Sequence, residues 1–213
     1  MLKIQRFIFS PFAENTYILW DDETNEAAVI DPGCYDDYER KMIDNFILEN
    51  NLNLKYLLNT HCHLDHIFGN CHIKKNYNVE YLIPEQELVL LENAPQQAAM
   101  FGFGRSEICK TDKFISEEFE LSLGKTKLQF IFTPGHSPGG YSIYCKQQKF
   151  CFTGDALFEG SIGRTDLPGG NHDLLLKSIH NKLFILPDET TIYPGHGESS
   201  TIGTEKETNP FLN

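Results

Sequence analysis

Four apolar runs of this chain end in the same way, in a tight turn that carries a histidine or an aspartate. The runs are LKYLLNT before HCHLDH, KLQFIF before TPGHS, KFCF before TGDALF, and TIY before PGHG. Short apolar runs bounded by turn residues predict buried β-strands. Glycine in such a turn permits a tight bend and a close approach of the backbone. The pattern therefore predicts strands whose ends present imidazole and carboxylate groups.

The densest of these turns is THCHLDH, residues 60–66, with three histidines and an aspartate in six consecutive positions. Imidazole and carboxylate are ligands that zinc and similar borderline ions favour. His61 and His63 are two residues apart, so one turn can direct both at one ion. Asp65 and His66 are adjacent, and their diverging side chains would more easily serve a second ion. The alternative is a solvated polar loop, which the position directly after a buried strand disfavours.

Three further candidate ligands stand in the other turns: His136, Asp155 and His196. Each of them alone would be interpreted as an ordinary loop residue. Together with the four groups of THCHLDH they supply seven nitrogen and oxygen ligands, a number that suits two metal ions.

The rest of the pattern predicts a mixed α/β chain with two groups of strands. The first half is expected to form strands in 3–9, 16–20, 26–31, 54–60 and 79–83, and helices in 35–50, 67–76 and 84–100. The second half is expected to form strands in 127–137, 139–145, 149–155 and 190–197, a helix in 172–186 and a short helix in 203–213. Each group of strands is followed by helices, which favours two sheets packed face to face with helices outside.

Composition narrows the functional classes. The net charge of −12 makes non-specific binding to nucleic acid unfavourable, because an acidic surface repels phosphates. No run is long enough to span a membrane, and the N-terminal residues do not resemble a signal peptide. Six cysteines in 213 residues are too few for a disulfide scaffold, so we expect reduced thiols and a cytoplasmic protein. A disulfide between Cys145 and Cys151, across a possible hairpin, is the less favoured alternative.

These stretches resemble the metallo-β-lactamase fold superfamily, and within it the glyoxalase II-like hydrolases (hydroxyacylglutathione hydrolases). The resemblance rests on THCHLDH, TPGHSPGG, FTGDALFEGSIGRTDLPGG and YPGHG, with NTYIL and DPG upstream, in the family's order. It implies an α/β (α+β) fold: a single domain over residues 1–213, built as a four-layer αββα sandwich with a dinuclear site along one edge of the sheets. The larger family members carry a C-terminal helical domain that helps to hold glutathione. This sequence ends about fifteen residues after YPGHG, so the thiol carrier stays open.

The resemblance also implies a mechanism. A water bound to a catalytic zinc has a pKa near ~7, and a hydroxide that bridges two ions would attack a thioester carbonyl such as that of S-lactoylglutathione. Two divalent ions are expected, most readily zinc, with iron or manganese as alternatives. The resemblance assigns the ligands His61, His63 and His136 to the first ion, Asp65, His66 and His196 to the second, and Asp155 to both. Asp65 would also orient the nucleophile, which makes it the candidate catalytic residue.

Some residues outside this set carry separate expectations. Cys62 lies between two outward-facing histidines and is expected to point away from the metal. Arg164 and Asp166, in GRTD, would form either a structural pair or a pair that supports the ligands. Residues 95–105 would form either a rim over the site or a helix end packed on the core. The partner is expected to be a small-molecule thioester, with no nucleic acid and no membrane, and the oligomeric state stays open.

Other activities of the same fold are the alternatives. A persulfide dioxygenase would use a single iron held by His63 or its neighbour, His136 and Asp155, but its segment after the aspartate differs from LFEGSIGRTDLPGG. A hydrolase of a different, non-glutathione ester or thioester is also possible on these residues. A β-lactamase would lack the bridging Asp155, and a nuclease would carry a basic groove. A non-catalytic protein would be expected to lose ligands. The number of bound metal ions discriminates between these alternatives.

Overall fold

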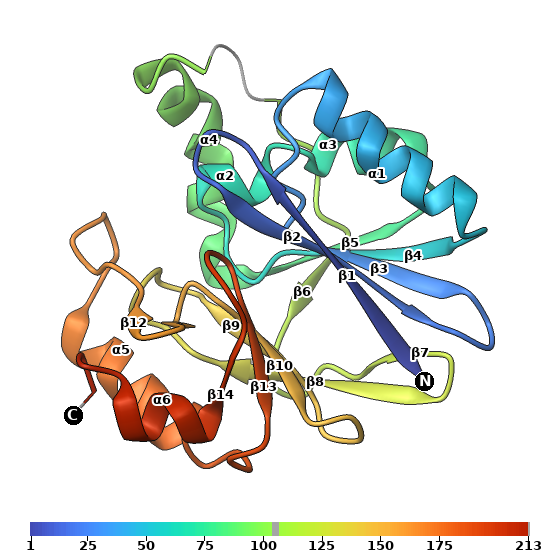
Figure 1. Cartoon of the computed structure of the whole chain (residues 1–213). Helices are drawn as coiled ribbons and strands as arrows, with labels where there is room; N and C mark the ends of the chain where they lie inside the picture. The colour runs from blue at the N-terminus through green and yellow to red at the C-terminus, as the bar shows by residue number, and fades with distance from the viewer. Residues whose placement is uncertain (104–106, 213) are drawn as a thin grey trace. The chain divides into compact units, whose positions relative to one another are not determined.

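The computed structural model describes residues 1–103 and 107–212, which form two compact units. The first unit comprises residues 1–114 and 123–126, and the second comprises residues 115–122 and 127–213. Each unit carries a sheet together with helices (Figure 1). The predicted mixed α/β chain with two groups of strands is therefore confirmed, whereas the face-to-face packing of the sheets and the single domain stay predictions. Within the described ranges, no helix has both the length and the apolar character needed to cross a lipid bilayer.

The first sheet has the strand order β1-β2-β3-β4-β5-β6. Its strands are Leu2–Phe9, Glu14–Asp21, Glu26–Ile30, Asn53–Leu58, Glu80–Pro84 and Lys113–Ile115. β1, β2 and β3 pair antiparallel, whereas β3, β4 and β5 pair in parallel. Parallel neighbours need a crossover connection. Here α1 (Asp37–Glu49) joins β3 to β4, and α2 (Leu64–Ile67) with α3 (Asn70–Asn76) joins β4 to β5. The turns that follow β3 and β4 therefore lie at the same edge of the sheet.

The helix α1 forms where it was predicted. Asp36 is its N-cap, and its carboxylate accepts a hydrogen bond from the backbone N–H of Glu39 at 2.8 Å. Ile43 and Ile47 face the sheet and are buried, which stabilises the unit by roughly 1.5–3 kcal/mol for each side chain. Met42, the residue before Ile43, is exposed. α1 and α3 lie side by side over the first sheet (Figure 1).

The helix predicted over 67–76 begins earlier, at Leu64, and is interrupted at residues 68–69. His63 is the extended residue before this turn, and the backbone N–H of His66 donates to the carbonyl of His63 at 3.1 Å. The side-chain amide of Asn59 donates to the carbonyl of His66 at 2.9 Å, which holds the end of the short helix. The predicted start of the helix at residue 67 was therefore too late, because Asp65 and His66 already occupy a helical turn. After β5, a 3₁₀ turn η1 (Glu85–Glu87) leads into α4 (Leu88–Met100).

The second sheet has the strand order β14-β13-β10-β9-β8-β7. In that order its strands are Ser200–Thr201, Thr191–Pro194, Phe150–Gly154, Tyr141–Cys145, Thr126–Phe132 and Leu121–Leu123. β9 and β10 form the predicted antiparallel hairpin, and β10 pairs in parallel with β13. A small hairpin, β11 (Leu157–Phe158) and β12 (Ser161–Ile162), follows β10. Phe150 lies opposite Cys145 in the hairpin, and all six cysteines are free.

The predicted helix over 172–186 forms as α5 (His172–Ser178), which continues into a π-helical turn η2 (Ile179–Leu183). Asn171 is its N-cap, and its side chain accepts from the N–H of Leu174 at 3.0 Å. Leu175, Ile179 and Leu183, which are four residues apart and form an apolar stripe along the helix, are fully buried. α6 (Ile202–Thr208) confirms the short helix predicted near the C-terminus, and it lies beside α5 (Figure 1).

Two hydrogen bonds and a close backbone contact hold the turn TPGHS against the start of α5. Gly135 has φ +131°, and a Cβ at this position would lie 2.3 Å from the backbone nitrogen of Leu175. The carbonyl of Gly135 accepts from the N–H of Asn171 at 2.7 Å, and the hydroxyl of Ser178 donates to the carbonyl of Pro134 at 2.7 Å. The glycine is required because the turn and the first turn of the helix are in backbone contact.

Replacement of Gly135 by alanine should therefore destabilise the protein by about 3 kcal/mol, because it combines an unfavourable φ with overlap against backbone atoms. Gly160→Ala is the matched control: Gly160 also has a positive φ, but a Cβ there meets nothing within 4 Å, so its cost should be about 1 kcal/mol. Urea unfolding of both variants measures the difference. Equal destabilisation would show that the contact with α5 contributes nothing.

Candidate metal centre

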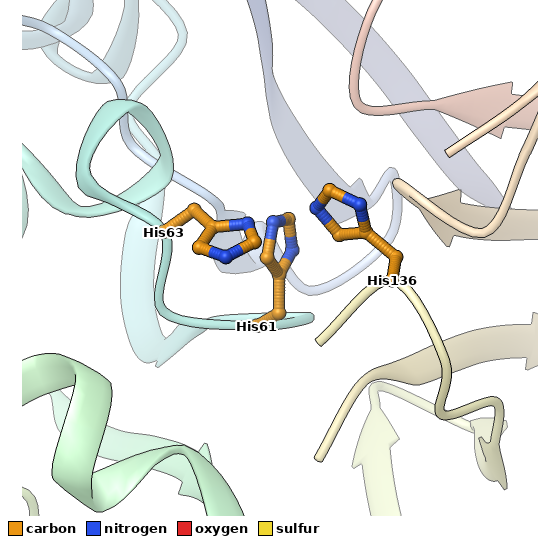
Figure 2. A group of neighbouring side chains, drawn as sticks. All are labelled: His61, His63 and His136. Carbon is orange, nitrogen blue, oxygen red and sulfur yellow. The ribbon is translucent and has the colours of Figure 1, made fainter. Parts of the chain in front are cut away.

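Four of the seven predicted ligands lie together in the first unit, between the end of β4 and α2. The ring centroids of His61 and His63 are 4.8 Å apart, with the rings perpendicular, and those of His61 and His66 are 4.1 Å apart. Nε2 of His66 lies 3.8 Å from Oδ2 of Asp65. Figure 2 shows the rings of His61 and His63 on the loop that runs into α2. The local geometry of THCHLDH therefore gathers three imidazoles and a carboxylate.

A further carboxylate that the sequence analysis did not select belongs to the same group. Asp31, His61 and His66 each offer a ligand atom within 4.8 Å of the others. Oδ2 of Asp31 is 3.2 Å from Nδ1 of His66, and the same carboxylate accepts from the N–H of Thr60 at 2.7 Å and from its hydroxyl at 2.6 Å. A histidine that binds a metal usually donates its other ring nitrogen to a carboxylate or carbonyl. Asp31 is therefore placed to orient His66 and to leave Nε2 on the side of Asp65.

The signal for Asp31 was present in the sequence. VIDPG places an acid directly after a buried strand, as FTGD does for Asp155. Asp31 has φ +47°, a left-handed conformation that aspartate tolerates better than most residues. Its backbone N–H donates to the carbonyl of Leu58 at 2.9 Å, so the turn after β3 is joined to the end of β4.

Glu14 lies behind His66 and is fully buried. Its Oε1 is 3.9 Å from Nδ1 of His66, and its Oε2 accepts from the hydroxyl of Thr16 at 2.9 Å. Burial raises the pKa of Glu14 well above its usual value, because water no longer solvates the carboxylate. The N–H of Gly33 donates to the hydroxyl of Thr16 at 2.8 Å. The hydroxyl of Thr16 thus connects the Glu14 carboxyl on β2 to the turn after β3.

Cys62 lies between His61 and His63 in the sequence, but its side chain does not belong to the group of candidate ligands. Its thiol is packed in the apolar core of the first unit, and burial raises its pKa well above the usual value, which keeps it a neutral thiol. Its backbone N–H donates to Oε2 of the buried Glu87 at 2.9 Å. The prediction that the Cys62 side chain faces away from the histidines is confirmed by this packing.

The other three predicted ligands lie together in the second unit, each after a strand. His136 follows β8, Asp155 follows β10 and His196 follows β13. Oδ2 of Asp155 is 3.4 Å from Nε2 of His136 and 3.7 Å from Nε2 of His196. One carboxylate oxygen therefore faces two imidazole nitrogens. Figure 2 shows the ring of His136 on its loop.

The main chain of GSIGRTD positions His136. Its Nδ1 lies 2.7 Å from the carbonyl oxygen of Arg164, so Nδ1 carries the hydrogen and Nε2 is left as the electron-pair donor. A Cβ at Gly163 would lie 1.9 Å from the carbonyl oxygen of Asp155 and 3.0 Å from Nδ1 of His136. Only glycine allows this close approach.

The side chains of Arg164 and Asp166 form an exposed pair. Nε and an Nη of Arg164 each donate to the Asp166 carboxylate at 2.7 Å. The guanidinium lowers the pKa of Asp166 to about 2. The two predicted roles were a structural pair and a pair that supports the ligands. The side chains of Arg164 and Asp166 form a surface pair, whereas the support for His136 comes from the backbone carbonyl of Arg164.

The predicted rim over residues 95–105 includes residues 104 and 105, which lie outside the described part of the chain. Up to residue 103 the segment is the end of α4 and its turn. The N–H of Phe103 donates to the carbonyl of Ala98 at 2.9 Å, and its ring lies 5.4 Å from that of Phe68. Met100 and Phe101 are exposed. The described part therefore agrees with a helix end whose last aromatic residue packs on the core.

The donor atoms fit divalent metal ions. Each unit combines imidazole nitrogens with carboxylate oxygens, the mixture that zinc, iron and manganese accept. In each unit one histidine is oriented through Nδ1, by Asp31 for His66 and by the carbonyl of Arg164 for His136. Such support is typical of metal ligands.

Comparison with known proteins agrees with this chemistry. The model of the metallo-β-lactamase superfamily matches residues 10–196, a span that contains all seven predicted ligands. Hydroxyacylglutathione hydrolase GloC of Haemophilus influenzae is 40% identical over 214 residues, which cover 100% of this chain and 99% of the relative.

Two solved structures are similar along nearly the whole chain. The structure of BLEG-1 B3 metallo-β-lactamase has a TM-score of 0.90 and 34% identity, and the match covers 99% of this chain and 100% of that one. The structure of TTHA1623 in a di-iron-bound form has a TM-score of 0.87 and 32% identity, covering 98% and 100%. Together with the family match, these similarities show that the chain belongs to the metallo-β-lactamase superfamily of metal-binding hydrolases, as a glyoxalase II-like member.

Proposed function

We propose that this protein is a dinuclear metal-dependent hydrolase of thioesters such as S-lactoylglutathione. The observation that carries the proposal is the Asp155 carboxylate, one oxygen of which faces both His136 and His196. A carboxylate shared in this way suits a pair of ions. The full-length similarity to a hydroxyacylglutathione hydrolase supports the thioester as substrate.

The seven ligands divide between two ions in this proposal. Bound there, two divalent ions would supply a water of lowered pKa as nucleophile and a Lewis acid for the carbonyl. Zinc is the proposed metal, and the di-iron form of a similar structure supports iron as the second candidate. The assignment gives His61, His63 and His136 to one ion, Asp65, His66 and His196 to the other, and Asp155 to both.

In this proposal, side chains and a backbone carbonyl of the protein hold the ligands in place, and a carboxylate accepts the proton of the attacking water. Of the two carboxylates Asp65 and Asp31 beside His66, Asp65 is the more accessible, with a side chain that is 16% exposed, whereas that of Asp31 is 3% exposed. Asp65 would orient the attacking water and accept its proton. Asp31 would keep His66 in one tautomer, and the carbonyl of Arg164 would do the same for His136. The thiol of the product would leave as a thiolate and take up a proton.

Two other activities remain as named alternatives. β-Lactam hydrolysis is supported by the similarity to a structure described as a B3 metallo-β-lactamase. A persulfide dioxygenase with a single iron would use fewer of the seven ligands. We also propose a cytoplasmic protein that binds a small molecule and no nucleic acid or membrane, which the six free cysteines and the net charge of −12 support.

The purified protein, loaded with zinc, should bind two ions per chain and hydrolyse S-D-lactoylglutathione with a kcat/KM of at least about 10⁴ M⁻¹s⁻¹. Metal analysis and release of free thiol measure the two quantities. A chromogenic cephalosporin and glutathione persulfide, the latter with iron-loaded protein, serve as comparison substrates. Faster turnover of the cephalosporin, or oxygen uptake with one iron per chain, would replace the proposal with the corresponding alternative.

Asp155→Asn should lower the metal content towards one ion per chain and reduce thioester turnover by more than ~100-fold, since loss of a shared ligand costs more than loss of a supporting group. Asp173→Asn, an exposed aspartate in the first turn of α5, is the control. Metal analysis after gel filtration and initial rates measure both effects. Full metal content with full turnover in Asp155→Asn would rule out the shared role.

Asp31→Asn should weaken binding of one metal ion by about 10–100-fold, because His66 loses its charged partner. Turnover should largely recover at saturating metal, a recovery that general unfolding would not allow. Titration with a chelating indicator measures the affinity, and Asp37→Asn, whose side chain is 90% exposed, is the control. An unchanged metal affinity in Asp31→Asn would show that the contact with His66 has no orienting role.

A further inference from the structure

A buried carboxylate on α6 lies outside the set of candidate ligands. Glu205 is 0% exposed, whereas Glu207, two positions later in the same helix, is exposed. Burying a carboxylate is costly unless hydrogen bonds replace the water that it loses. What Glu205 does in the second unit therefore depends on the groups that bind its two oxygens.

Three donors surround this carboxylate. The backbone N–H of Gly160 donates to Oε2 at 2.9 Å, and the side-chain amide of Asn209 donates to the same oxygen at 2.8 Å. The hydroxyl of Ser200 donates to Oε1. The amide of Asn209 also donates to the carbonyl of Ser161 at 3.0 Å. All three donors to the carboxylate are neutral, so these contacts are hydrogen bonds and not ion pairs.

Two of the donors belong to the loops that carry candidate ligands. Gly160 is in the turn of the hairpin β11–β12, which follows Asp155 in the chain. Ser200 is the first residue of β14, directly after the loop that carries His196. One buried carboxylate thus binds the segment that follows each of these ligands.

The same two loops are also joined at their beginning. The N–H of Gly195 donates to the carbonyl of Gly154 at 2.9 Å, and these glycines directly precede the two ligands. The hydrogen bonds to Glu205 join the loops a second time, after the ligands. Each ligand therefore lies between two points at which its loop is held.

The hairpin also brings an aromatic ring to His196. The ring centroid of Phe158, in β11, lies 6.2 Å from that of His196, and the two rings are nearly perpendicular, at 89°. This is the edge-to-face arrangement that aromatic rings favour. Phe158 lies opposite Ser161 in the hairpin, and the carbonyl of Ser161 is the one that Asn209 binds. The carboxylate of Glu205 is therefore connected to His196 along two routes, through the Phe158 ring and through the start of β14.

We propose that Glu205 is a positioning residue for His196, a ligand of the second ion in the proposed function on which this inference rests. Its carboxylate holds the hairpin β11–β12 and the start of β14, and these two elements keep the imidazole in the orientation that binds metal. Glu205 acts through hydrogen bonds and not by contact with the ion. Groups that orient a metal ligand in this way are typically worth about 10–100-fold in metal affinity.

Two substitutions separate hydrogen bonding from the rest of the side chain. Glu205→Gln can keep every contact, because its carbonyl oxygen can accept from Gly160 and Asn209 while its amide donates to the hydroxyl of Ser200. Glu205→Leu fills the site with an apolar side chain that accepts none of the three hydrogen bonds, and it leaves their donors without a partner there. The acceptor, and not the negative charge, is what the proposal requires.

Two further variants serve as controls. Glu207→Leu makes the same change at the exposed glutamate of α6. Leu183→Ala removes a fully buried side chain from the core of the second unit and none of these hydrogen bonds. It therefore measures the effect of lost stability alone. Circular dichroism verifies that each variant is folded under the conditions of the metal titration.

Zinc titration with a chelating indicator tests the proposal on the full-length protein. Glu205→Leu should bind one of the two ions about 10–100-fold more weakly, while Glu205→Gln and both controls should bind both ions as the wild type does. Phe158→Leu should weaken the same ion, and its effect should be smaller in the Glu205→Leu background, because the two residues act along one route. Wild-type affinities in Glu205→Leu, or an equal loss in Glu205→Gln or in Leu183→Ala, would overturn the proposal.

A measurement on the metal-free protein keeps this inference distinct from the proposed function. The Phe158 ring current shifts the ring protons of His196 in the histidine NMR spectrum, and His196→Gln identifies the signal. Phe158→Leu should remove this shift, Glu205→Leu should move the signal in the same direction, and Glu205→Gln should leave it in place. An unmoved signal in Glu205→Leu would overturn the inference even in an active thioesterase. A wild type that binds no metal would count against the proposed function, whereas the signal would still decide whether Glu205 positions His196.

Discussion

The contact between the carboxylate of Asp31 and the imidazole of His66 joins the two turns that carry the chemistry of the first unit. Asp31 follows β3 and His66 follows β4, and these strands are parallel neighbours. The same carboxylate receives two hydrogen bonds from Thr60, at the start of the histidine motif. Because all of these groups are buried, the orientation of each one depends on the others. A single acid at the end of a strand thus holds both His66 and the residue that precedes His61.

In the second unit a histidine is oriented through Nδ1 as well, but by a backbone atom instead of a carboxylate. There a backbone carbonyl, that of Arg164, receives the hydrogen on Nδ1 of His136. The close approach is possible because Gly163 has no side chain to separate Asp155 from the ring. A carbonyl acceptor places a requirement on the path of the backbone, and Gly163 meets that requirement in this loop.

Much of this could be predicted from the sequence, because it depends on local patterns. The apolar stripe of Leu175, Ile179 and Leu183 and the cap at Asn171 determine a helix with few alternatives. The extent of α2 could not be predicted, since it depends on the side chain of Asn59 binding the carbonyl of His66. Asp31 was overlooked for a similar reason: its role arises only when β3 and β4 lie side by side. Short strands such as β6, β7 and β14 carry too few residues for a pattern to show.

The order of the ligands along the chain has a consequence for biosynthesis. Residues 1–114, with their own apolar core, leave the ribosome before any residue from 127 onward. Domains generally fold in this order as they are made. The group of Asp31, His61 and His66 is therefore complete on the nascent chain while His136, Asp155 and His196 are still to be translated. The proposed ligands of the first unit can thus be in place, and exposed to the metal ions of the cell, before those of the second unit have been synthesised.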